Sequence, residues 1–138
     1  MRRLIVGVDA SRNRSGGAEA YLIGMLSAVN PLDFGIKEVH LWAPDFLLNK
    51  LEDYKWLIKH STKELQQSVI KQIWWQTTRL RHEAKSIGCD IMFTTDASTL
   101  GRFKPMIVLS QDMLSYEPGA MRHYGYTSHR MRLLAKLL

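Results

Sequence analysis

Short apolar runs alternate with helical patterns along most of this chain, and the alternation constrains the fold more than any other feature. The clearest run, at residues 3–9, is continuously apolar and ends in Asp9, which is typical of a strand covered on both faces in a parallel sheet. Residues 10–17 then form a polar turn that ends in two glycines, and apolar residues at helical spacing follow over residues 18–29. Strand, turn and helix in this order predict an α/β domain with a mainly parallel sheet.

The same reading extends to the rest of the chain. Four more strands are expected, at residues 37–43, 54–59, 90–95 and 105–110. In the strand at 37–43, Val39, Leu41 and Ala43 share one face, so this face should pack against a helix.

Two further helices and one long helical segment are expected between and after these strands. A short helix is expected at residues 45–51, and a final basic helix should begin at Thr127 or Ser128 and run to the end of the chain. Ser61 followed by Glu64 is a capping-box pattern that predicts the start of the long segment, within which a break is compatible with the sequence. Residues that should face the core recur every three or four positions until Gly88 ends the helix. These residues are Leu65, Val69, Ile73, Thr77, Leu80, Ala84 and Ile87. Trp74 and Trp75 are expected in the core and at its edge.

Composition limits the classes of protein to consider. The 138 residues are 46% apolar and 23% charged, which suits one globular domain. A formal charge of +6 favours contact with phosphates, acidic lipids or nucleic acids without choosing among them. The lone Cys89 excludes an internal disulfide and is too little for a zinc or iron–sulfur site, which indicates a reducing, cytoplasmic compartment. The five histidines lack the spacing of metal ligands, so no metal is expected.

Ligands of parallel sheets gather beyond the carboxyl ends of the strands. Three loops should therefore border one crevice, at residues 10–17, 96–104 and 111–117. In the first, Gly16 and Gly17 would let backbone N–H groups approach a phosphate or carboxylate, although such a pair is more often a tight connection. In the third, Gln111 could hydrogen-bond sugar hydroxyls and Asp112 could orient a hydroxyl, unless Asp112 only caps a turn.

The order and spacing of three segments resemble those of a known family. The segments are GVDASRNRSGGAEAYLIGMLSAV, IWWQTTRLRHEAKSIGCDIMFTTDAST and VLSQDMLSYEPGAMRHYGYTSHRMRLL. Together they resemble the N-terminal half of family-four glycosyltransferases of the GT-B fold. The resemblance implies that residues 1–138 form a Rossmann-like, three-layer acceptor-side domain, which faces a second domain that holds a nucleotide-sugar. The chain stops inside an apolar helical pattern, so we expect the donor domain to be absent and this piece to fold without transferring sugar.

The resemblance also implies roles for particular residues. Gly16 and Gly17 correspond to the double glycine that lies against the donor diphosphate and the transferred sugar. Gln111 and Asp112, the expected catalytic residues, occupy the place of a polar pair that is commonly His-Asp, or Gln-Asn in some subgroups. Since an amide does not titrate, Gln111 would position substrate rather than transfer a proton. The acceptor side would be shaped by three residues: Arg12, Asp96 and Ser98. Family members of this architecture typically retain anomeric configuration and need no bound metal, and no cofactor is expected.

The leading hypothesis is therefore part of an enzyme that transfers a sugar from a nucleotide-sugar to a saccharide or lipid-linked acceptor, in the building of a surface polysaccharide. The alternative is a non-catalytic nucleotide-binding α/β module. A nucleic-acid binder is the weakest reading because no helix-turn-helix, KH or RRM signature is present. A peripheral contact with the inner face of the membrane is a further hypothesis, on a basic helix face that is otherwise solvated: Arg79, Arg81, His82 and Lys85.

Overall fold

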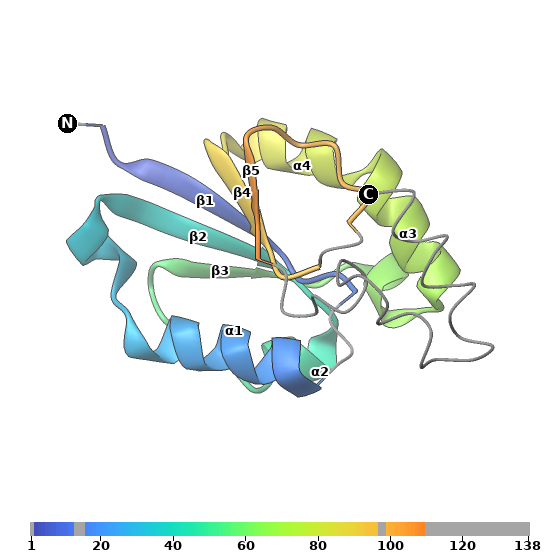
Figure 1. The fold of residues 1–138 in the computed structure, drawn as a ribbon, viewed down its shortest axis with the longest axis horizontal. Helices are drawn as coiled ribbons and strands as arrows, with labels where there is room; N and C mark the ends of the chain where they lie inside the picture. Colours follow the sequence, from blue (N-terminus) through green and yellow to red (C-terminus); the bar gives the residue numbers. More distant parts are fainter. Residues whose placement is uncertain (1, 13–15, 97–98, 110–138) are drawn as a thin grey trace, which may run out of the picture.

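The computed structural model describes residues 2–12, 16–96 and 99–109. In this part of the chain it is an α/β domain built on a five-stranded parallel sheet of order β3-β2-β1-β4-β5 (Figure 1). The predicted fold class is confirmed. The strands are β1 (Leu4–Asp9), β2 (Ile36–Trp42), β3 (Leu57–His60), β4 (Ile91–Thr94) and β5 (Met106–Val108). Because β1 pairs with both β2 and β4, its carboxyl end lies in the middle of the sheet edge.

Helices cover both faces of the sheet and make three layers. In Figure 1, α1 (Gly16–Ala28) and α2 (Asp45–Leu48) lie on one side, and α3 (Val69–Thr78) and α4 (Leu80–Ile87) lie on the other. On the α1 side, Leu22 and Leu26 pack against Val39 and Leu41 of β2, so the predicted apolar face of that strand is confirmed. On the other side, Trp42 of β2 belongs to a second core cluster with residues of α3, α4 and β4, among them Trp75, Leu80, Ala84 and Met92.

The predicted start of the long helical segment was wrong. Ser61 does not cap it, because its hydroxyl donates to the carboxylate of Asp45 instead. A short 3-10 helix, η2 (Lys63–Gln66), comes first, and α3 begins only after Ser68, whose hydroxyl accepts from the backbone N–H of Lys71. The segment then breaks at Arg79 into α3 and α4.

The predicted core stripe holds in α4 but not in α3. Leu80 and Ala84 are fully buried, as the periodicity indicates, whereas Val69 is 43% exposed. The tryptophan pair divides in the same way, since Trp75 is fully buried and Trp74 is 45% exposed. The core side of α3 is occupied instead by Gln72 and Gln76 together with Trp75.

Other boundaries shift by a few residues. Helix α1 begins at Gly16, so the two glycines that were assigned to a turn form its first residues. Strand β3 is shorter than expected, because residues 54–56 precede it in a turn. Gly88 ends α4 as predicted, with a φ of 92° that favours glycine. A second 3-10 helix, η1 (Pro31–Phe34), connects α1 to β2. Among the described residues, no helix combines the length and the apolar character needed to cross a bilayer.

Candidate functional site at the carboxyl ends of β1 and β4

A buried carboxylate marks the point where β1 ends. Asp9 is the last residue of β1 and is only 1% exposed. Its Oδ1 accepts hydrogen bonds from the backbone N–H of Ser11 at 3.0 Å and from the Ser11 hydroxyl at 2.6 Å, and its Oδ2 accepts from Nε2 of Gln76 at 2.7 Å. Burial raises the pKa of the Asp9 carboxyl, and the hydrogen bonds from Ser11 and Gln76 partly offset this effect.

The end of β4 is tied to the end of β1 by side-chain hydrogen bonds. The hydroxyl of Thr94 donates to the backbone carbonyl of Asp9 at 2.8 Å and accepts from the backbone N–H of Asp96 at 3.0 Å. From the other side, Oε1 of Gln76 accepts from the backbone N–H of Leu100 at 3.1 Å. The loop after β4 is therefore held against β1 and α3 by buried polar groups, which suits a rigid edge of a site.

An ion pair joins the loop after β1 to the loop after β4. Arg12 donates through Nε to Asp96 Oδ2 at 2.9 Å and through an Nη to Oδ1 at 3.2 Å, and the two side chains are 14% and 12% exposed. Such a bidentate ion pair is the strongest interaction that an arginine and a carboxylate make. Two of the three loops expected to border one crevice are thus in direct contact, and two predicted acceptor-side residues are brought together.

The glycine pair lies at the start of α1, at this same edge of the sheet. A Cβ placed on Gly16 or Gly17 would meet no described atom within 4 Å. The described residues therefore leave room for a larger side chain at both positions, so crowding does not explain the two glycines. Backbone N–H groups of a first helical turn point out of the helix and attract anions, so the space beside the pair is suited to a phosphate or a carboxylate.

The remaining predicted site residues lie outside the described residues. These are Ser98, Gln111 and Asp112. The structure therefore brings Arg12 and Asp96 together, places the glycine pair at the same edge, and leaves the other three as predictions.

A second polar cluster lies on β2 and β3, where no sequence spacing predicted one. Nδ1 of His40 is 2.8 Å from Nε2 of His60, and Nε2 of His40 is 3.0 Å from a carboxylate oxygen of Glu38. The ring of His60 also stacks on Trp42, with 4.7 Å between ring centres. Burial lowers the pKa of His60, and the neighbouring His40 lowers it further. In the described part of the chain, no three His, Cys, Asp or Glu side chains form a group that could hold a metal ion.

Sequence reasoning missed the residues that build the inner part of the site. Asp9 served only to mark the end of a strand, and Ser11, Gln76 and Thr94 were given no role. One signal was available, because an acidic residue at the carboxyl end of a central apolar strand is placed where ligands of parallel sheets gather. Gln76 gave no such signal, since its partner Asp9 is 67 residues away.

Comparisons with known protein families, curated proteins and solved structures produced no match to this chain. The functional assignment therefore depends on the sequence resemblance and on the geometry of this edge of the sheet.

Proposed function

We propose that this chain is the acceptor-side domain of a glycosyltransferase that moves a sugar from a nucleotide-sugar to a saccharide or lipid-linked acceptor. Two findings support the proposal. The order and spacing of the three sequence segments resemble the N-terminal half of family-four enzymes, and the parallel, three-layer fold agrees with the Rossmann-like domain that this resemblance implies.

The observation that carries the proposal is the open space at the glycine pair. Gly16 and Gly17 start α1 next to the end of β1, and no described atom lies within 4 Å of a Cβ placed on either. Glycine leaves the backbone N–H groups of this helix start uncovered by a side chain of its own, which favours the approach of a donor diphosphate. A residue larger than glycine would project into the space that the diphosphate needs.

The Arg12–Asp96 pair holds the loop after β1 against the loop after β4 at the same edge of the sheet. Both carboxylate oxygens of Asp96 accept from Arg12, so the positive charge of Arg12 is already balanced. In the proposed enzyme the pair therefore orients the loops that face the acceptor rather than moving a proton. Gln111 and Asp112 follow β5 in the sequence and are proposed to contact the acceptor and the transferred sugar.

Transfer of the sugar itself requires a second domain on the other side of the cleft. A nucleotide-sugar and an acceptor react only when they are aligned and shielded from water, which in a two-domain enzyme takes place in the cleft between the domains. We therefore expect this chain alone to bind donor fragments weakly and to show no sugar transfer.

The proposal is tested by following backbone N–H signals of the chain by NMR during titration with three ligands: a nucleotide-sugar, the corresponding nucleoside diphosphate and the nucleoside alone. The proposal predicts that the first two shift the Gly16 and Gly17 signals and that the nucleoside does not. A nucleotide-binding module that recognises the base would respond to the nucleoside as well. Shifts confined to other parts of the chain would contradict both readings.

A further inference from the structure

Helix α3 places polar side chains beside Trp75 on its core side and leaves large apolar side chains exposed. It buries two glutamines, Gln72 and Gln76, which are 2% and 1% exposed, while Ile70 is 77% and Trp74 45% exposed. Both buried amides donate a hydrogen bond, Gln72 to the carbonyl of Leu65 and Gln76 to the carboxylate of Asp9. The exposed apolar side chains contribute little to the core, and neighbouring exposed apolar groups of this kind mark surfaces that contact something else.

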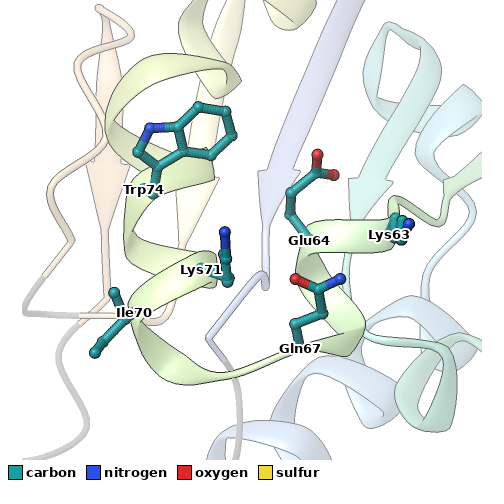
Figure 2. A pocket seen from close by; sticks show the side chains of 6 residues that line it. All are labelled: Lys63, Glu64, Gln67, Ile70, Lys71 and Trp74. Carbon is teal, nitrogen blue, oxygen red and sulfur yellow. The ribbon is translucent and has the colours of Figure 1, made fainter.

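These side chains border a groove of about 380 Å³ between α3 and η2. Figure 2 shows Ile70, Lys71 and Trp74 on α3, with η2 beside them. The groove is lined by Lys63, Glu64, Gln67, Ile70, Lys71 and Trp74. It therefore combines an aromatic ring and an aliphatic side chain with two ammonium groups.

The charge of this surface is predominantly positive. Lys63 and Lys71 face one acidic lining residue, Glu64, and the guanidinium of Arg79 lies 5.5 Å from the centre of the Trp74 ring. Lysine and arginine keep their charged ends in water while their aliphatic stems lie along apolar groups, and tryptophan favours the boundary between lipid headgroups and acyl chains. Exposed apolar residues flanked by cations on one helix face are typical of helices that lie in the surface of an anionic bilayer.

We propose that the α3 face, defined as Val69, Ile70 and Trp74 with Lys63 and Lys71, docks onto an anionic lipid bilayer. The apolar side chains would enter the headgroup region, and the lysines would contact lipid phosphates. The expected basic face of α4 fits this role less well, because α4 exposes no large apolar side chain. The proposal stands independently of the proposed function, since it uses neither the glycine pair nor the Arg12–Asp96 pair.

Sedimentation of the full chain with lipid vesicles tests the proposal. The chain should sediment with vesicles of equal parts phosphatidylcholine and phosphatidylglycerol, and should stay in solution with vesicles of phosphatidylcholine alone. Ile70→Ser should weaken binding to the anionic vesicles about tenfold through loss of apolar contact. Lys63→Gln combined with Lys71→Gln should weaken it by about tenfold or more through loss of two charges.

Matched control variants come from the opposite end of the sheet. Phe34 is 71% exposed and precedes the amino end of β2, whereas α3 contacts the carboxyl end of β1 through Gln76. Phe34→Ser and Lys37→Gln remove an exposed apolar group and an exposed charge away from the α3 face, so both should leave binding unchanged. Because Ile70 and Phe34 are largely exposed, the thermal unfolding midpoint should hardly change in either serine variant.

A second readout locates the contact. Vesicles with brominated acyl chains quench tryptophan fluorescence only at short range, and Trp74→Phe keeps an apolar ring at the site while removing its signal. The proposal predicts strong quenching in the unsubstituted chain and much weaker quenching in Trp74→Phe at equal vesicle binding. Absence of binding to anionic vesicles would overturn the proposal. So would binding that Ile70→Ser leaves intact, which would indicate a purely ionic contact or a different surface.

Discussion

Gln76 donates from its side-chain amide to the buried carboxylate of Asp9 across 2.7 Å, and this hydrogen bond joins α3 to the carboxyl end of β1. The same side chain accepts from the backbone N–H of Leu100. One glutamine thus connects the helix, the central strand and the loop after β4. A buried carboxylate is tolerated only when donors surround it, so the position of α3 and the ionisation of Asp9 depend on one another.

Replacing Gln76 by Met should destabilise the fold by about 2 kcal/mol, because a buried carboxylate loses a donor and the N–H of Leu100 loses its acceptor. The free energy of unfolding from urea denaturation measures this loss.

Gln72→Met is the matched control on the same helix. The Oε1 of Gln72 has no hydrogen-bond partner among the described residues, and its Nε2 makes one bond to the carbonyl of Leu65. Its replacement should cost about 1 kcal/mol. Equal losses of unfolding free energy in the two variants would show that the burial of the Asp9 carboxylate does not depend on the hydrogen bond from Gln76.

Acidification should destabilise the protein through His60. Burial lowers the pKa of His60 below its ordinary value of 6.5, with His40 adding to the shift. Between these two pKa values the unfolded chain binds a proton that the folded chain does not, so the free energy of unfolding falls as the pH drops through 6.5 towards the lower folded-state pKa.

Urea denaturation at about pH 7.5 and about pH 5.5 measures the effect. His60→Gln keeps a hydrogen-bonding side chain beside His40 but cannot titrate, and its unfolding free energy should depend less on pH over this range. An identical pH dependence in the variant would assign the effect to other groups.

Cys89 should react slowly with thiol reagents. Burial raises the pKa of its thiol to about 11 from an ordinary value of 9.0, and the carboxylates of Asp90 and Glu38 add to the shift. The reactive thiolate is then about a hundredfold rarer near neutral pH than for an unperturbed thiol. A disulfide reagent such as Ellman's should therefore label the folded chain far more slowly than the urea-unfolded chain. Similar rates in both states would contradict the burial of this side chain.

Local sequence patterns predicted the parts of the fold that depend on local causes. A continuous apolar run indicates β1, and alternating apolar residues indicate β2. Gly88 ends α4 because its backbone adopts a conformation that few other residues accept. The register of α3 could not be predicted in this way. Apolar periodicity places Val69 inside, but the helix turns Gln72 and Gln76 inward.

Long-range pairing explains why the register and the site escaped prediction. Gln76 and Asp9 are 67 residues apart, and Arg12 and Asp96 are 84 residues apart. Periodicity reports only neighbours along the chain, so it cannot show that a buried amide on a helix has a carboxylate partner on a strand far away in the sequence. The general location of the site was predictable, because ligands of parallel sheets gather at the carboxyl ends of the strands. The residues that build it were visible only in part.

The central claim is that a diphosphate binds in the open space beside Gly16 and Gly17. The most direct measurement compares the affinity of a nucleoside diphosphate for the unsubstituted chain, for the double variant Gly16→Ala with Gly17→Ala, and for Gly24→Ala. Gly24 lies in the same helix and also has no described atom within 4 Å of a placed Cβ. Its replacement should stabilise the fold by about 0.5–1 kcal/mol without changing affinity.

In the double variant, the account predicts a folded chain whose affinity for the nucleoside diphosphate is at least about tenfold weaker, because two methyl groups occupy the approach of the phosphates. Equal affinity in the unsubstituted chain and the double variant, measured from the shifts of backbone N–H signals during titration, would contradict it.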